Sequence, residues 1–140
     1  MKIAVVYWSG TGNTETMANA VLEGVKDAGA EGVLLGAADF TADQMNEYDA
    51  LAFGCPSMGV ESLEESEFEP MFQGCESLLA GKRVALFGSY GWGDGEWMRN
   101  WEDRCRADGA ELVCESVICN DAPNDSAITA CKALGAALAN

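Results

Sequence analysis

Apolar positions follow two alternating patterns along the chain. Short, nearly continuous apolar runs predict buried strands, and these runs lie at 2–7, 32–35, 50–54, 83–88 and 111–119. Between them, apolar residues recur at helical spacing and predict helices at 13–28, 67–79, 96–107 and 126–139, with a shorter helix at 41–46. Met17, Val21 and Val25 form one such stripe, and Gly29 is a typical stop for the helix that carries it.

The regular alternation of strands and helices predicts the fold class. Five strand–helix units imply a doubly wound α/β fold, in which a five-stranded parallel sheet carries helices on both faces. The 140 residues, 1–140, are expected to form one domain, because no linker, repeat or low-complexity segment divides them. In open parallel sheets, ligands bind beyond the carboxyl ends of the strands, where the strand order reverses. The loops after the first, third and fourth strands are therefore expected to form a site.

The first of these loops is rich in small residues and hydrogen-bond donors. It consists of Ser9, Gly10, Thr11, Gly12, Asn13 and Thr14. The loop opens a helix, whose N-terminal N–H groups favour an anion. It lacks the lysine of a Walker A loop, and Glu15 replaces the third glycine of the dinucleotide motif. We therefore expect it to bind the terminal phosphate of a mononucleotide; the alternative is a plain turn with a helix cap.

The other two loops combine glycines with groups that pack on flat rings. One consists of Cys55, Pro56, Ser57, Met58, Gly59, Val60 and Glu61. The other consists of Ser89, Tyr90, Gly91, Trp92, Gly93, Asp94 and Gly95. Because a thioether and an indole both pack well on a π-face, we expect Met58 and Trp92 to hold a large planar ring between them. Ordinary surface packing is the alternative for either loop taken singly.

The net charge of −15, from 8 cationic and 23 acidic residues, excludes two classes of partner. Nucleic acids require clusters of lysine and arginine, and anionic membrane surfaces repel such a protein. The charge favours basic protein partners, although acidity that merely maintains solubility is the alternative. No segment reaches the roughly 18–20 apolar residues of a membrane span, and the N-terminal apolar run is too short for a signal peptide. We therefore expect a cytoplasmic protein.

The cysteines and the absence of histidine narrow the chemistry further. Six cysteines form no C-x-x-C pair and are expected to be reduced and mostly buried. Without any histidine, the chain cannot form Ser-His-Asp or Cys-His catalytic groups or most zinc sites. The cysteine spacing also disfavours an iron–sulfur cluster. We therefore expect neither catalytic residues nor a metal site.

Four stretches together indicate a family. The stretches VYWSGTGNTE, GCPSMG, LEESEFEP and ALFGSYGWGDGEWM resemble those of short-chain flavodoxins of the clostridial and Megasphaera type, and the similarity runs through most of the chain. The segment ELVCESVIC, read as an uninterrupted fifth strand, agrees with the short-chain form. The resemblance implies strand order 2-1-3-4-5, one non-covalently bound FMN and a one-electron carrier that is not an enzyme.

The resemblance also implies roles for individual residues. The first loop, Gly12 included, would bind the FMN phosphate, while Trp92 and Met58 flank the isoalloxazine. Glu61 would accept a hydrogen bond from flavin N3–H, and backbone groups near Ser89, Gly91 and Gly93 would meet the pyrimidine end. The full expected set is Ser9, Gly10, Thr11, Gly12, Asn13, Thr14, Pro56, Ser57, Met58, Gly59, Val60, Glu61, Ser89, Tyr90, Gly91, Trp92, Gly93, Asp94 and Asn120.

Its redox behaviour follows from the same resemblance. The peptide after Met58 would turn over on formation of the semiquinone; Gly59 permits that change, whereas the β-branched Val60 resists some turn geometries. The nearby carboxylates would make the second potential low, so that the protein cycles between semiquinone and hydroquinone. It would be a monomer that replaces ferredoxin between basic redox partners such as reductases and ferredoxin-linked oxidoreductases.

The sequence leaves three alternative functions. An FMN-dependent reductase needs room for a second ring, which Trp92 would obstruct, and an arginine cluster for a nicotinamide phosphate, which is absent. A phospho-receiver domain needs acidic residues at the ends of the first and third strands, where this chain has Trp8 and Cys55. A structural or adaptor role is the third alternative.

Overall fold

The computed structural model describes residues 1–140 and contains one parallel sheet. Its strands are β1 (Lys2–Tyr7), β2 (Glu31–Gly36), β3 (Ala50–Gly54), β4 (Arg83–Tyr90), β5 (Glu111–Leu112) and β6 (Val117–Asn120). They pair in the order β2-β1-β3-β4-β5, and β6 pairs with β4 as well. This order confirms the predicted doubly wound topology, with its reversal point between β1 and β3.

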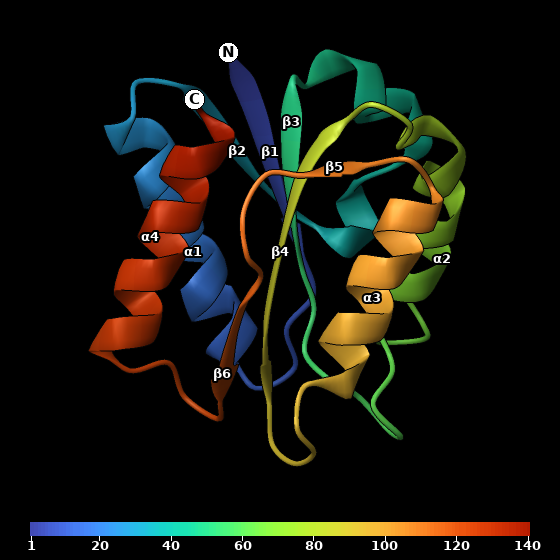
Figure 1. Cartoon of the computed structure of the whole chain (residues 1–140), viewed down its shortest axis with the longest axis vertical. Helices are drawn as coiled ribbons and strands as arrows, with labels where there is room; N and C mark the ends of the chain where they lie inside the picture. The colour runs from blue at the N-terminus through green and yellow to red at the C-terminus, as the bar shows by residue number, and fades with distance from the viewer.

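Two pairs of helices cover the two faces of the sheet (Figure 1). They are α1 (Asn13–Asp27) with α4 (Asp125–Leu138), and α2 (Phe68–Cys75) with α3 (Glu96–Ala107). Three short 3₁₀ turns, η1 (Ala37–Asp39), η2 (Ala42–Glu47) and η3 (Glu76–Leu78), complete the set. None of the helices is long and apolar enough to cross a membrane.

The helix boundaries follow local capping chemistry. The short helix expected at 41–46 is the 3₁₀ turn η2, which a capping box between Thr41 and Gln44 begins. The helix expected at 67–79 is α2, which tightens into η3 after Cys75. Asn124 caps α4 by accepting the Ala127 N–H at 2.9 Å, so this helix begins one residue earlier than predicted.

Successive side chains of β1 point to opposite faces of the sheet and contribute to two cores, one on each face. Ala4 and Val6 pack on the side of α2 and α3, whereas Ile3 and Val5 pack on the side of α1 and α4. Each of these residues is fully buried, as expected for a strand with helices on both faces. The alternation continues past the strand, since Trp8 packs against the core beneath α2 and α3.

The fifth strand differs from the prediction. The segment expected at 111–119 is divided into β5 and β6, which pair in parallel with different parts of β4. Between them, the Ser116 hydroxyl donates to the Glu102 carboxylate of α3 at 2.6 Å, and residues 114–116 form no ladder with β4. β4 is also two residues longer than predicted, because Ser89 and Tyr90 pair with β6.

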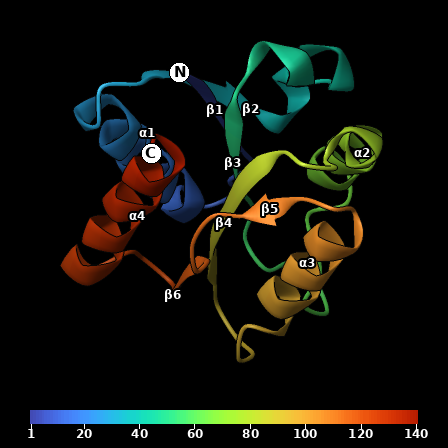
Figure 2. The same cartoon turned by 45° about the horizontal axis from the view of Figure 1, so that its top comes forward.

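The carboxyl ends of β1, β3 and β4 lie at one end of the molecule, at the bottom of Figure 1. Because the strands are parallel, the loops that leave them lie at the same end of the sheet, and Figure 2 shows the loop from β4 leading into α3 there. Their meeting place is the edge at which the sequence predicts a ligand site.

Candidate functional site

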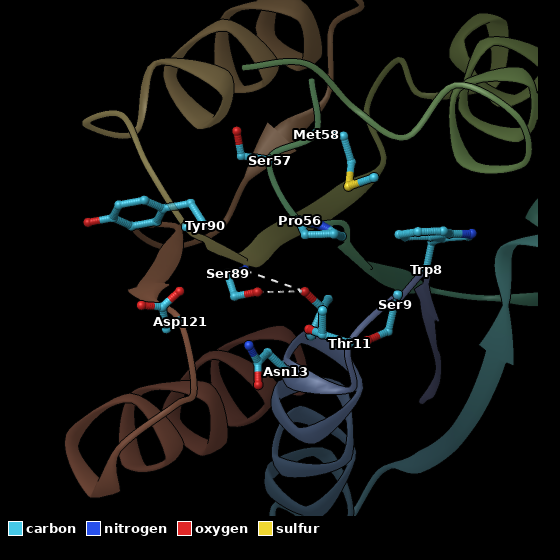
Figure 3. Close-up of a pocket in the computed structure, with 13 residues that line it drawn as sticks. Trp8, Ser9, Thr11, Asn13, Pro56, Ser57, Met58, Ser89, Tyr90 and Asp121 are labelled. Carbon is cyan, nitrogen blue, oxygen red and sulfur yellow. Dashed lines mark hydrogen bonds between the residues drawn. The ribbon is translucent and has the colours of Figure 1, made fainter. Parts of the chain in front are cut away.

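The three loops enclose a cavity of ≈ 210 Å³ (Figure 3). Many of the predicted site residues line it, namely Ser9, Gly10, Thr11, Asn13, Thr14, Pro56, Ser57, Met58, Ser89, Tyr90 and Gly91. In Figure 3, Trp8 and Met58 stand at one side of the cavity and Tyr90 at the opposite side, with Thr11 and Asn13 below them. The prediction that these three loops come together is therefore confirmed.

The loop after β1 points free backbone donors toward the cavity. The Ser9 hydroxyl accepts the N–H groups of Gly12 at 3.1 Å and Glu15 at 3.2 Å, which folds the loop back on the start of α1. Gly12 has a φ of 98°, a conformation that favours glycine. The remaining N–H groups of the loop make no hydrogen bond within the chain and belong to Ser9, Gly10, Thr11, Asn13 and Thr14. Free donors at a helix N-terminus form an anion-binding site.

A buried contact joins this loop to β4. Thr14 Oγ1 lies 3.3 Å from Ser89 Oγ and accepts the Ser89 N–H at 3.4 Å. The Ser89 carbonyl in turn accepts the N–H of Ser57 at 3.0 Å. All three loops are thus connected through Ser89.

The loop after β3 forms a closed turn beside the cavity. Met58 N–H donates to the Ser62 carbonyl at 2.7 Å, and Ser62 N–H donates to the Met58 carbonyl at 2.9 Å. Within the turn, Gly59 and Glu61 have φ values of 53° and 45°. Met58 lines the cavity, and the Val60 side chain is 87% exposed.

A buried carboxylate anchors the other end of this loop. Glu64 accepts N–H groups from Glu67 at 2.8 Å and Phe68 at 2.9 Å, together with the N–H and hydroxyl of Ser66. Burial raises the pKa of the Glu64 carboxyl, but these hydrogen bonds outweigh that effect and lower it overall. Glu64 is therefore a charged cap for α2 and fixes the loop where it enters the helix.

Glu61 connects the loops after β3 and β4. Its carboxylate accepts the N–H of Glu96, the first residue of α3, at 3.1 Å. The same carboxylate lies against Gly93, where an added Cβ would approach it to 2.7 Å. In the same loop, the Arg99 guanidinium binds Asp94 at 2.9 Å and lowers the pKa of that carboxyl. Glu61 thus caps α3 from another loop.

The other predicted site residues lie outside the cavity lining. They are Gly12, Gly59, Val60, Glu61, Trp92, Gly93, Asp94 and Asn120. Trp92 is 62% exposed, so its indole has little protein contact. Asn120 donates a hydrogen bond to the Tyr90 carbonyl at 3.4 Å. The expected contacts of these residues with a flavin stay predictions.

The cavity also contains two residues that the sequence analysis missed. Trp8 donates its indole N–H to Glu67 at 2.9 Å, and its ring lies 3.0 Å from an added Cβ on Gly10. Asp121 follows β6 with a φ of 57° and donates its N–H to the Tyr90 carbonyl at 2.8 Å. Each has a signal in the sequence: Trp8 ends an alternating strand, and aspartate tolerates the left-handed turn at a strand end.

Comparisons with known proteins agree with this geometry. The flavodoxin family profile matches residues 5–135. The chain is 44% identical to the flavodoxin of Clostridium beijerinckii over 136 residues, which is 97% of this chain and 98% of that protein. It is also 44% identical to the flavodoxin of Megasphaera elsdenii over 137 residues, again 98% of both chains.

The fold is shared with a solved relative. The solution structure of two-electron reduced Megasphaera elsdenii flavodoxin superimposes with a TM-score of 0.90 and 45% identity, and the match covers 98% of each chain. The profile, the sequence identities and the superposition each extend over nearly the whole length of this chain. The chain therefore belongs to the flavodoxin family, in its short-chain form, whose members are FMN-containing electron-transfer proteins and not enzymes.

Proposed function

We propose that this flavodoxin is a low-potential one-electron carrier that binds FMN in the cavity at the carboxyl end of the sheet. It would exchange electrons with basic protein partners in the role otherwise taken by ferredoxin, as a monomer in the cytoplasm. The observation that carries the proposal is the set of free N–H donors at the start of α1, which face a cavity shared with Met58 and Tyr90. When bound, FMN supplies the capacity to accept and release single electrons.

The residues of the first loop fit the phosphate of this cofactor. The free N–H groups of Thr11, Asn13 and Thr14 provide donors, and the α1 dipole adds favourable electrostatics. Gly10 leaves the loop without a Cβ next to the Trp8 ring, where one would be crowded at 3.0 Å. The chain places no lysine in this loop, so backbone and hydroxyl groups would hold the phosphate.

The other two loops fit a flat ring. Met58 already lines the cavity, and the exposed indole of Trp92 is free to cover one face of the ring. Glu61 would accept the flavin N3–H. A carboxylate has two oxygens with several lone pairs, so Glu61 can serve this donor while it holds the Glu96 N–H.

The charges near the cavity favour a low potential for the more negative one-electron couple. A like charge about 5 Å away at an effective dielectric of roughly 20 disfavours negative charge on the ring by about 3 kcal/mol. Arg104 binds Glu69 at 2.6 Å and Arg99 binds Asp94 at 2.9 Å, so these two carboxylates contribute less. Asp121, which lines the cavity, and Glu61 belong to no ion pair, and we expect them to supply most of the effect.

The same acidity supports docking of basic partners. The net charge of −15 would steer a cationic redox protein toward this one, at a rate that falls as salt rises. Electron transfer to a basic haem protein, followed by stopped flow from low to high ionic strength, tests this part of the proposal. A rate independent of salt would overturn the docking assignment.

Reconstitution with FMN tests the proposed function as a whole. We expect the protein to bind one FMN and to show two separate one-electron steps during stepwise dithionite reduction. Rapid mixing with NADH and NADPH should give no fast reduction of the flavin. A protein that cannot be reconstituted, or one that nicotinamides reduce rapidly, would contradict the proposal.

A further inference from the structure

The turn that carries Met58 has a fixed base and a free tip. At the base, Met58 and Ser62 exchange two backbone hydrogen bonds, at 2.7 and 2.9 Å. The backbone N–H and C=O groups of the three residues between them, Gly59, Val60 and Glu61, make no hydrogen bond within the chain. The two parts of the turn are therefore held very differently.

Packing holds the tip only at Glu61, whose carboxylate lies against Gly93. The Val60 side chain is 87% exposed, and Gly59 lies in open surroundings, with only the Ser62 hydroxyl within 4 Å of an added Cβ. Glu61 has a positive φ, which a residue with a Cβ rarely adopts. Its carboxylate contact with the Glu96 N–H is the one hydrogen bond from the tip to the rest of the protein. The shape of the turn therefore depends mainly on its base.

One side chain reinforces that base. The Ser62 hydroxyl donates to the Met58 carbonyl at 3.1 Å, so this carbonyl accepts both the N–H and the O–H of the same residue. Ser62 is exposed, and its hydroxyl makes no other hydrogen bond. Its contribution is therefore a hydrogen bond rather than burial.

We propose that Ser62 is a positioning residue that acts through Met58. Its hydroxyl keeps the base of the turn closed, which holds the Met58 side chain at the cavity and confines backbone motion to the tip. The carbonyl groups of that tip are then the part of the loop that is free to adapt to the bound cofactor. This inference rests on the proposed function, because it concerns the site in which FMN would bind.

Two consequences follow for the loaded protein. Opening of the base would release the Met58 carbonyl and let the thioether leave the cavity, so the affinity for FMN would fall. The resemblance implies that the peptide after Met58 turns over with the redox state. A closed base would fix the ends of that movement, so opening the base would also change the separation between the two one-electron potentials. Global stability would not change, because Ser62 is exposed and no residue of the turn from Met58 to Ser62 belongs to either buried core.

The test compares Ser62→Val with Ser62→Thr in the FMN-loaded protein. Both side chains are β-branched and nearly the same shape, but only threonine keeps the hydroxyl. For Ser62→Val we expect the amides of positions 58 and 62 to exchange with deuterium about fivefold faster and FMN to bind about fivefold more weakly. The separation of the potentials should change, and the thermal midpoint should not. Ser62→Thr should match the wild type in all four measurements.

The outcomes are distinct. If Ser62→Val matches the wild type in exchange, affinity and potentials, the hydroxyl has no positioning role and the inference fails. If both variants change alike, side-chain shape is responsible and the inference also fails. Failure of the proposed function appears earlier and separately, as a wild-type protein that binds no FMN.

Discussion

Thr14 and Ser89 are separated by 75 positions in the sequence, yet their hydroxyl oxygens lie 3.3 Å apart in the interior. Thr14 is the second residue of α1, and Ser89 lies near the end of β4, so the contact joins the loop with free N–H donors to the strand that leads to Trp92. The two ends of the candidate site are therefore positioned by one buried hydrogen-bonded pair.

Replacing Thr14 with valine should damage both stability and FMN binding. The substitution leaves the buried Ser89 N–H and hydroxyl without their partner, which costs about 1–3 kcal/mol. Urea unfolding of the apoprotein and titration with FMN measure the two effects. Thr14→Ser is the matched control and should retain most of the wild-type values; a Thr14→Val protein with an unchanged urea midpoint would show that the contact is unimportant.

Replacing Trp92 with alanine should weaken FMN binding without destabilising the apoprotein, because the indole is 62% exposed. Loss of a stacking side chain reduces affinity by about 1–3 kcal/mol. It should also raise the potential of the more negative couple, because water gains access to the ring. Flavin fluorescence gives the affinity and a redox titration gives the potential. Trp92→Phe should show smaller changes, and equal potentials in all three proteins would argue against a role for this residue.

Replacing Gly59 with threonine should reduce the separation between the two one-electron potentials. Gly59 has a φ of 53°, and a β-branched residue resists the backbone changes that the tip of the turn requires. A penalty of about 1.4 kcal/mol corresponds to roughly 59 mV for a one-electron couple. Spectroelectrochemical titration measures the separation directly, with Gly59→Ala as a milder comparison. If the separation of the two potentials is unchanged, backbone change at the tip of the turn does not affect them.

The pH dependence of stability should reveal a pair of carboxyl groups far from the cavity. A hydrogen bond from the Asp108 carboxyl to Glu76, with added contributions from burial and the Glu76 charge, raises the pKa of Asp108 to about 6. The pKa of Glu76 is lowered, chiefly by its hydrogen bond with Arg104. Asp108 Oδ2 is buried, and no donor of the chain reaches it while both carboxyl groups are ionised, so it gains a partner only when one of the two is protonated.

Because folding raises the pKa of Asp108 from 3.8, the folded state binds more protons than the unfolded state between that value and about 6. The stabilisation from protonated Asp108 is therefore complete below the unfolded pKa and is lost as the pH rises through about 6. Asp108→Asn removes this loss, so its urea midpoint relative to the wild type should increase between about pH 4 and pH 7. Parallel pH profiles for the two proteins would contradict the shared proton.

The elements that local pattern alone determines were predicted best. The limits of β1, β3 and α3 agree with the sequence analysis residue for residue, because each is a clear apolar run or stripe next to a glycine or a turn. β4 proved longer and the fifth strand proved interrupted, since both depend on partners from other segments, namely β6 and Glu102. The local periodicity of apolar residues cannot predict contacts between side chains that are distant in the sequence.

In the candidate site, too, the features set by local sequence were predicted and those set by contacts between distant segments were not. The three loops could be assigned from strand ends and glycine content, and the structure brings them together. The Glu61 contact with α3 and the presence of Trp8 and Asp121 in the lining depend on how loops pack against one another. Spacing within a single loop carries no information about such neighbours.

The interruption between β5 and β6 makes this edge of the sheet a natural place for additional sequence. β5 and β6 are each hydrogen-bonded to β4 independently, and the Val113 N–H still donates to the Val84 carbonyl, so an insertion beside Glu115 would break neither pairing. A peptide tag or a small partner domain grafted at this point would leave the Thr14–Ser89 contact intact. The protein could then be tethered to an electrode or fused to a reductase through this segment, and the three loops of the candidate site would stay accessible.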